Sequence, residues 1–184
     1  HKVGKAMQWE SARPIVNAGF SFLDQHIAEL DADTDKQTDI VQTAGSFIYV
    51  WLNRTENGWS QRFTEPSPDS QLQLDLDTVQ LADMNGDRLL DLVHISPGTC
   101  HFYPGMGFGR FGEKIQMNNP PVSIPEQNRL FLVDVNSDGQ SDAVYLGNEI
   151  QVWLNHGLNT ADHSQADFAA PFSVSSPYLN AFFA

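Results

Sequence analysis

The chain has 184 residues, of which 41% are hydrophobic and 18% are charged, and 23 acidic against 10 basic side chains give a formal net charge of −13. This composition is typical of a globular domain. The basic side chains are few and dispersed and form no basic stripe that could bind phosphates, so nucleic acid is excluded as an expected partner. No apolar run approaches the roughly eighteen residues of a membrane span, so we expect no membrane insertion by this chain. The single cysteine, Cys100, excludes an intramolecular disulfide.

In chain order, the sequence predicts short strands rather than helices. No window of about twelve residues carries an apolar stripe at helical spacing without interruption by Gly, Pro or Asp. The predicted strands lie at 39–42, 47–52, 59–63, 78–82, 91–95, 100–103, 111–117, 142–146, 150–154 and 168–174. Two further apolar runs, at 27–30 and 130–133, each stand directly before an aspartate-rich stretch, as the predicted strand 78–82 does.

A nine-residue aspartate-rich stretch occurs three times, and the first residues of successive copies lie 52 and 51 positions apart. An apolar run precedes each copy, and an aliphatic pair follows it. An aromatic residue stands eleven or twelve positions after the last aspartate of each copy, namely Trp51, Tyr103 or Trp153. Roughly four short strands in a repeat of about fifty residues are typical of a β-propeller blade.

The aspartate loops are the candidate metal sites. Side-chain oxygens at positions 1, 3 and 5, with a backbone carbonyl at position 7, form the first half of an EF-hand loop, and an aspartate at position 9 takes the place of the distant glutamate. Hard oxygen ligands without Cys or His favour structural Ca²⁺. The side-chain ligands expected are Asp31, Asp33, Asp35 and Asp39, then Asp83, Asn85, Asp87 and Asp91, then Asp134, Asn136, Asp138 and Asp142. The expected carbonyl donors are those of Gln37, Leu89 and Gln140.

The same pattern is also compatible with simple Asp/Asn turns, in which short side chains bond their own backbone. Repetition establishes the turn more firmly than the metal. Position 6, where such loops favour Gly, is Gly139 in the third loop but Lys36 and Arg88 in the first two. Ca²⁺ is therefore expected first in the loop 134–142.

We expect one partial propeller domain, 1–184, with repeats at about 20–64, 72–118 and 128–175. Propellers typically use four to eight blades, and an open arc leaves strand edges unpaired. The expected partners are therefore other protein subunits or the remainder of a larger polypeptide that completes the ring.

The D-x-[DN]-x-D-G-x-x-D loop between two short strands resembles the FG-GAP/VCBS repeat of integrin-type propellers. More specifically, the segment 81–95, followed by the stretches FYPGMGFGRFG at 102–112 and MNNP at 117–120, resembles the propeller of bacterial toxin-complex B components and SpvB-type virulence proteins. The resemblance covers about residues 20–157. The chain departs from that pattern at Arg88, at Phe102 with Tyr103, and at Gly105 with Met106.

The resemblance implies a non-catalytic docking, gating or scaffold module of a toxin-complex B-like bacterial virulence protein, secreted or extracellular. In that family the propeller docks on the translocation pore of the A component. The alternative is a calcium-stabilised extracellular adhesion or ligand-binding propeller, similar to that of integrins.

Three further features are interpreted as structural. Cys100 and His101 are adjacent on a predicted strand and so point to opposite faces, which favours a core cysteine over a catalytic pair. The aromatic residues after each loop favour packing between blades over sugar stacking. The glycine-rich stretch 105–109 follows an aromatic strand and opens no helix, so no phosphate site is expected there.

Overall fold

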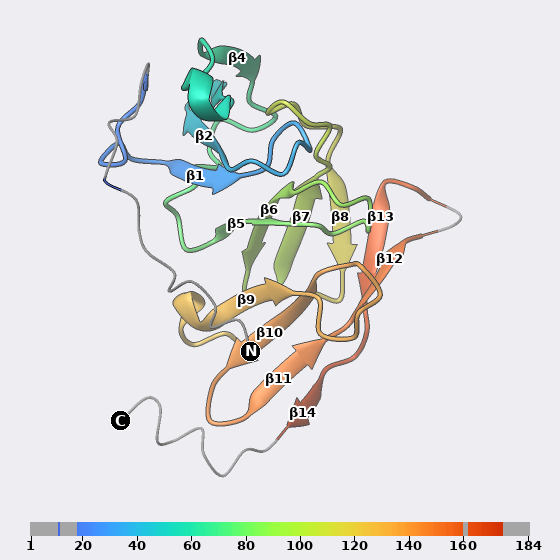
Figure 1. Ribbon diagram of the computed structural model, residues 1–184. Helices are drawn as coiled ribbons and strands as arrows, with labels where there is room; N and C mark the ends of the chain where they lie inside the picture. Colours follow the sequence, from blue (N-terminus) through green and yellow to red (C-terminus); the bar gives the residue numbers. More distant parts are fainter. Residues whose placement is uncertain (1–10, 12–17, 160–161, 175–184) are drawn as a thin grey trace, which may run out of the picture.

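The computed structural model describes residues 11, 18–159 and 162–174, and nearly all regular structure in this part of the chain is β-strand. Two short 3-10 turns, Thr55–Asn57 and Gln127–Arg129, accompany the strands, and no helix of the described residues is long and apolar enough to cross a membrane. Three sheets follow one another in chain order from the top to the bottom of the molecule (Figure 1). The predicted all-β class with propeller-like blades is confirmed.

Blade 1 is an antiparallel meander with the strand order β1-β2-β3-β4. Its strands are β1 (Ile27–Leu30), β2 (Asp39–Ala44), β3 (Phe47–Trp51) and β4 (Phe63–Pro66). The last strand begins four residues later than the predicted 59–63. Trp59 forms only an isolated bridge with Asn53, because the chain is still turning there.

Blade 2 repeats this meander. Its strands are β5 (Val79–Ala82), β6 (Asp91–Ser96), β7 (Thr99–Tyr103) and β8 (Ile115–Asn118). The burial patterns of β6 and β7 are identical to those of β2 and β3, as the sequence repeat requires. Phe111 forms an isolated bridge with Gly105, the counterpart of the Trp59–Asn53 bridge, so β8 is shorter than the predicted 111–117.

Blade 3 has the strand order β14-β11-β10-β9. Its strands are β9 (Leu130–Val133), β10 (Asp142–Leu146), β11 (Ile150–Trp153) and β14 (Phe172–Val174). Between β11 and β14 the chain leaves this blade and forms the hairpin of β12 (Asn155–Leu158) and β13 (Gln165–Phe168).

The hairpin joins blade 2, because β13 pairs in parallel with β8. The second sheet therefore has six strands instead of the four predicted, in the order β12-β13-β8-β7-β6-β5. The single predicted strand 168–174 is wrong: it is divided between β13 and β14, which belong to different sheets. This addition pairs the outer edge of blade 2, which would otherwise expose unpaired backbone groups.

Each blade has two faces, which we name by the end of its third strand. Face A carries the terminal aromatic residue (Trp51, Tyr103 or Trp153), and face B carries the residue before it (Val50, Phe102 or Val152). Successive residues of a strand point to opposite faces. Two internal interfaces follow, and both place face B of one blade on face A of the next. Between blades 2 and 3, Phe102 and Trp153 share one buried cluster. Between blades 1 and 2, Leu74 and Phe111 pack against the cluster that contains Val50 and against the cluster that contains Tyr103.

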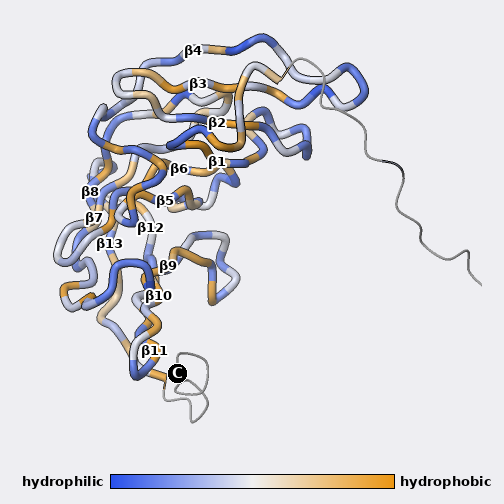
Figure 2. Tube along the Cα trace, turned by 90° about the vertical axis from the view of Figure 1, so that its left-hand side faces the viewer, coloured by the Kyte–Doolittle hydropathy of each residue, from blue (hydrophilic) through white to orange (hydrophobic). Residues whose placement is uncertain are grey.

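Figure 2 shows the strands β1–β4 above β5–β8, with β9–β11 below them. Polar and steric contacts fix these blades relative to one another. The Gln80 side-chain amide on β5 donates to the Leu130 carbonyl (2.8 Å) and accepts from the Leu132 N–H (3.1 Å), so it bridges to β9 of the next blade. A Cβ at Gly109, where φ is +75°, would lie well inside contact distance of Val50 Cγ2. The glycine-rich stretch 105–109 is thus a close contact between blades 1 and 2.

Candidate metal centre in the aspartate loops

Each aspartate loop joins the first strand of a blade to its second strand. Asp31, Asp83 and Asp134 stand directly after β1, β5 and β9, and Asp39, Asp91 and Asp142 are the first residues of β2, β6 and β10. The repeat therefore places three equivalent loops at equivalent ends of three blades.

The aspartate at position 1 organises the loop backbone. Its two carboxylate oxygens accept N–H groups from later positions of the same loop. The bonds run to Asp31 from Asp35 (3.1 Å) and Lys36 (2.9 Å), to Asp83 from Gly86 and Arg88 (2.7 Å each), and to Asp134 from Ser137 (2.7 Å) and Gly139 (3.0 Å). This is the Asp/Asn turn chemistry that the sequence also allowed.

The aspartate at position 9 acts as a buried brace. Asp39, Asp91 and Asp142 are each 0% exposed. One oxygen of each accepts the N–H of loop position 2, at 2.8 Å from Ala32, 2.8 Å from Met84 and 3.0 Å from Val135. The other oxygen accepts an N–H two residues beyond the aromatic of the third strand, at 2.7 Å from Asn53, 2.8 Å from Gly105 and 2.8 Å from Asn155. The carboxylate thus ties the loop to the end of the third strand.

Burial changes the acidity of these braces. Desolvation raises the pKa of Asp39, although the N–H groups of Asn53 and Ala32 oppose the change. Desolvation likewise raises the pKa of Asp91 to about 7, against the opposing hydrogen bonds from Gly105 and Met84. Asp33 and Asp35 for the first brace, and Asp87 and Asp83 for the second, add to the increase by like-charge repulsion.

Two positions in every loop adopt left-handed backbone conformations. Position 6 has φ of 69° at Lys36, 72° at Arg88 and 92° at Gly139, so the sharp turn expected there forms with or without glycine. Position 4 is also left-handed, at Thr34, Gly86 and Ser137. The glycine at position 6 therefore does not distinguish the third loop from the other two.

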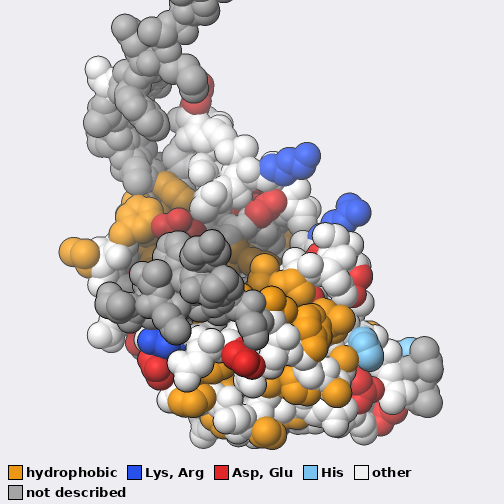
Figure 3. Space-filling view, turned by 90° about the horizontal axis from the view of Figure 1, so that it is seen from below, with side chains coloured by type: hydrophobic (Ala, Val, Ile, Leu, Met, Phe, Trp, Pro, Cys, Tyr) orange, Lys and Arg blue, Asp and Glu red, His pale blue; other side chains and the backbone are white. Residues whose placement is uncertain are grey.

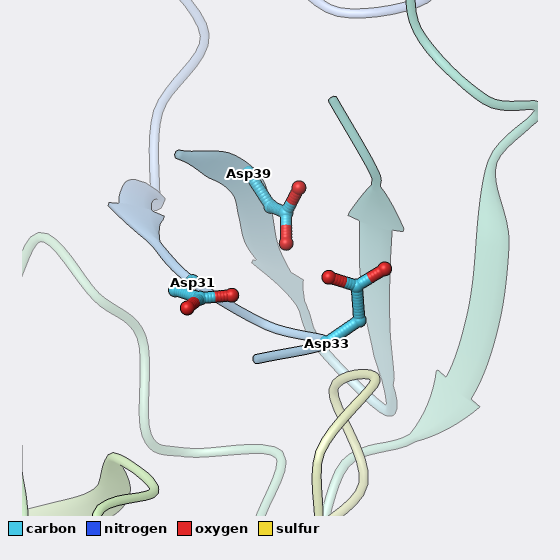
Figure 4. Close-up of side chains that lie close together, drawn as sticks. All are labelled: Asp31, Asp33 and Asp39. Atoms are coloured by element: carbon cyan, nitrogen blue, oxygen red, sulfur yellow. The ribbon is translucent and has the colours of Figure 1, made fainter. Parts of the chain in front are cut away.

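The first loop brings three carboxylates together. Asp31, Asp33 and Asp39 offer oxygen atoms that all lie within 4.8 Å of one another, and Figure 4 shows the carboxylates of Asp33 and Asp39 pointing toward each other. The Asp33 side chain is only 7% exposed, and its Oδ1 is buried without a hydrogen-bond partner. A buried carboxylate oxygen normally has a partner, so this atom fits a cation ligand.

A cation of the protein already contacts this loop. The guanidinium Nη1 of Arg54, in the turn after β3, lies 2.9 Å from Asp33 Oδ2 and 3.5 Å from Asp35 Oδ2. Arg54 thus compensates part of the charge of this loop, although it is 21 residues from Asp33 in the sequence. It leaves Asp33 Oδ1 free to bind a second cation.

The second and third loops differ because asparagine occupies position 3. Asn85 donates to Asp87 Oδ2 at 3.0 Å, and Asn136 donates to Asp138 Oδ2 at 2.8 Å. The remaining oxygen of each position-5 aspartate accepts the N–H of Leu89 or Gln140, at 2.8 and 2.9 Å. In these two loops the side chains at positions 3 and 5 are therefore hydrogen-bonded to each other. Among the described residues, only the first loop brings three acidic side chains within 4.8 Å of one another.

The aspartates were recognised from the sequence, but several of their partners were not. Arg54, Asn53, Gly105 and Asn155 carry no local signal of a role in the loops. Three of them do share one offset, two residues after Trp51, Tyr103 and Trp153, and that offset identifies them once the repeat is aligned.

The other chemistry-bearing residues lie elsewhere. Cys100 is 0% exposed in the core between blades 2 and 3, and burial raises the pKa of its thiol, which confirms the structural interpretation. His101 is on the opposite face of β7 and stacks on His94 of β6 with ring centroids 5.0 Å apart. The three aromatic residues Trp51, Tyr103 and Trp153 are buried. Tyr103 and Trp153 belong to clusters between blades, as expected, whereas Trp51 packs against Phe20 with ring centroids 5.5 Å apart.

Comparison with known proteins shows the fold. No protein-family model and no curated protein matches the chain. Among solved structures, a Photorhabdus luminescens Tc holotoxin pore is similar over 76% of this chain, with 22% identity and a TM-score of 0.57. A TcdB2-TccC3 complex is similar over 72% of the chain, with 16% identity and a TM-score of 0.52.

A third solved structure is of a different kind. It is a lectin of Agrocybe aegerita described as recognising non-reducing terminal N-acetylglucosamine, similar over 88% of this chain with 18% identity and a TM-score of 0.56. The chain spans 6% of the holotoxin chain, 8% of the TcdB2-TccC3 chain and 40% of the lectin chain. The fold of this chain is therefore shared with Tc toxin components and with a lectin.

Proposed function

We propose that this chain is a non-catalytic propeller module with a docking or scaffold role in a toxin-complex-like assembly. The observation that carries the proposal is the structural similarity to Tc toxin components over 76% and 72% of the chain. The toxin-complex B-like pattern of residues 81–95, 102–112 and 117–120 supports the same role from the sequence.

The internal contacts support a rigid scaffold. Gln80 bridges blades 2 and 3, and Gly109 packs against Val50 of blade 1. Each position-9 aspartate accepts two backbone N–H groups and so fixes its loop to the end of the third strand of the same blade. A docking module needs such fixed relative positions, since ordering of mobile parts on binding reduces affinity.

The alternative is a cation-stabilised ligand-binding propeller of the adhesion type. The similarity to the Agrocybe aegerita lectin over 88% of the chain and the unpartnered Asp33 Oδ1 favour it. In this case Asp31, Asp33 and Asp39 would hold Ca²⁺, which would neutralise part of their charge and stabilise the loop. The neutral counterpart Asn85 in blade 2 predicts weaker cation binding there.

One binding experiment separates the two functions. The immobilised chain is exposed to a purified Tc pore-forming component and, in a parallel titration, to N-acetylglucosamine. Saturable binding of the pore component without a response to the sugar supports the docking role. Binding of the sugar alone supports the lectin-like function and overturns the docking role. The absence of both responses also overturns the docking role.

Cation binding is tested separately by thermal unfolding in Ca²⁺ and in EDTA. A ligand that binds only the native state must raise the melting temperature. We expect Ca²⁺ to stabilise the wild type and to lose its effect in Asp33→Asn, with Asn136→Asp as a control that alters the third loop instead. Equal melting temperatures of the wild type in Ca²⁺ and in EDTA would contradict a structural cation.

A further inference from the structure

The first aspartate loop carries one more carboxylate than the other two loops. Position 3 is Asp33 in the first loop, whereas it is an asparagine, Asn85 or Asn136, in the second and third. Carboxylates that lie close together without a counter-charge repel one another, and this repulsion destabilises the folded loop. The additional charge of Asp33 therefore requires compensation that the other loops do not need.

The compensating charge comes from a position that repeats in every blade. It lies three residues after the terminal aromatic residue of the third strand and is Arg54 in blade 1, Met106 in blade 2 and His156 in blade 3. Met106 and His156 are exposed, and within residues 18–159 and 162–174 neither forms an ion pair with its loop. The arginine thus occurs in the one blade that has the additional carboxylate.

Basic side chains are sparse in this molecule, with 10 against 23 acidic ones. The space-filling view shows isolated Lys and Arg side chains among acidic and uncharged ones (Figure 3). Arg54 nevertheless contacts two aspartates of one loop, since its Nη1 lies 2.9 Å from Asp33 Oδ2 and 3.5 Å from Asp35 Oδ2. In so acidic a chain, this contact indicates that the guanidinium is matched to the loop.

Arg54 engages the position-5 aspartate outside the candidate cation site. One oxygen of Asp35 faces the guanidinium, and the other accepts the N–H of Gln37 at 2.8 Å. The carboxylates whose oxygens lie within 4.8 Å of one another are those of Asp31, Asp33 and Asp39. The fourth ligand expected from the sequence, Asp35, is therefore bound to other groups of the protein.

Asp33 connects the guanidinium to the candidate cation site. Its side chain is 7% exposed, its Oδ2 pairs with Arg54, and its Oδ1 is buried without a hydrogen-bond partner. A metal ion at Oδ1 would share this carboxylate with the guanidinium. The two positive charges would then lie close together and repel each other, and the burial of Asp33 limits the screening by solvent.

We propose that Arg54 is a tethered counter-cation that competes with Ca²⁺ for the first aspartate loop and lowers its affinity for the metal. The guanidinium neutralises Asp33 and Asp35 when no metal is bound. Because Ca²⁺ affinity depends on the charge and number of the oxygen ligands, removal of Arg54 strengthens metal binding and weakens the metal-free loop. The inference rests on the cation site proposed above for this loop and adds what regulates its occupancy.

The test is a calorimetric titration of the full chain with Ca²⁺. Arg54→Met removes the charge but keeps an unbranched apolar stem, and it introduces the residue that blade 2 has at the equivalent position, Met106. We expect this variant to bind Ca²⁺ about tenfold more tightly than the wild type, which corresponds to about 1.4 kcal/mol. Arg54→Lys, which retains the charge, should bind with an affinity closer to that of the wild type.

Thermal unfolding in EDTA gives a second readout with the opposite direction. Arg54→Met should melt below the wild type, because Asp33 and Asp35 lose their counter-charge, and Ca²⁺ should raise its melting temperature by more than that of the wild type. The double variant Asp33→Asn/Arg54→Met reproduces the Asn85 and Met106 pair of blade 2. It should melt near the wild type in EDTA and show no additional stabilisation by Ca²⁺.

Arg62→Met is the matched control, because it removes the same charge from blade 1. The Arg62 guanidinium lies over the Tyr49 ring, 4.1 Å from its centroid, and in the described part of the chain it forms no ion pair with the first loop. This variant should bind Ca²⁺ with the affinity of the wild type. An equal gain in affinity for Arg62→Met and Arg54→Met would overturn the proposal, since the effect would then reflect net charge alone.

The titration separates failure of this inference from failure of the cation site. Equal Ca²⁺ affinities of the wild type and Arg54→Met would overturn the role of Arg54 while the cation site stands. Weaker binding by Arg54→Met would also overturn it, because Arg54 would then hold Asp33 in place for the metal. Absence of Ca²⁺ binding in both proteins would overturn the cation site and this inference together.

Discussion

Replacing Asp142 with alanine tests the brace at position 9 most directly. The carboxylate is 0% exposed and accepts two N–H groups, from Val135 at 3.0 Å and from Asn155 at 2.8 Å. A hydrogen bond to a charged group contributes about 1.5–3 kcal/mol, so the loss of both is expected to lower the free energy of unfolding by about 3–6 kcal/mol. This is a large share of the roughly 5–15 kcal/mol that stabilises a typical domain.

The measurement is urea unfolding in EDTA, so that no bound cation contributes. Asp138→Ala in the same loop is the control, because Asp138 is exposed and its bonds to Gln140 and Asn136 compete with water. We expect a loss of less than about 1 kcal/mol for the control. Equal losses for the two variants would refute the brace, and a large loss for Asp142→Ala only when Ca²⁺ is present would assign Asp142 to cation binding instead.

Two further predictions concern pH and backbone geometry. Burial, together with Lys114 and His94, lowers the pKa of His101 to about 4 from 6.5, while Asp69 acts in the opposite direction. The neutral ring is favoured in the folded protein, so its contribution to stability is present above about pH 6.5 and is lost as the pH falls toward 4. The melting temperature of the wild type should therefore fall more steeply over this range than that of His101→Gln, and parallel curves would contradict the assignment. Gly109→Ala adds a Cβ against Val50 at φ +75°, whereas Gly98→Ala has the same φ with nothing within 4 Å. The first variant should lose roughly 2–5 kcal/mol and the second about 1–2 kcal/mol, and equal unfolding midpoints of the two would show that the contact with Val50 is unimportant.

The repeat made much of the fold predictable. Strands next to the aspartate loops were placed well, because the loop fixes where β6 begins at Asp91 and β10 at Asp142. The outer strands were less predictable. Trp59 and Phe111 look like strand residues, but both follow an irregular turn and form only isolated bridges. Their aromatic side chains serve packing between segments, which hydrophobic pattern alone does not separate from a strand.

The β12–β13 hairpin was not predicted at all. Its sequence, with Asn155, His156 and Gly157, is polar and reads as a loop, and its parallel pairing with β8 depends on a contact between segments almost fifty residues apart, Gln165 and Gln116. Long-range pairing of this kind leaves little trace in local sequence.

The candidate site was predictable in position but not in detail. A carboxylate that binds a cation and one that binds two backbone N–H groups require the same residue type, so the sequence could not distinguish a ligand from a brace at Asp39. Arg54 could not be recognised as the cation beside Asp33, because only the fold brings the turn after β3 to the loop.

The measurement that tests the docking role most directly is the affinity of the full chain for a Tc pore-forming component, determined once in EDTA and once in Ca²⁺. The docking role predicts saturable binding with the same dissociation constant in both solutions, because the blades are held by the protein's own hydrogen bonds. No saturable binding in either solution, or binding that disappears in EDTA, would contradict it.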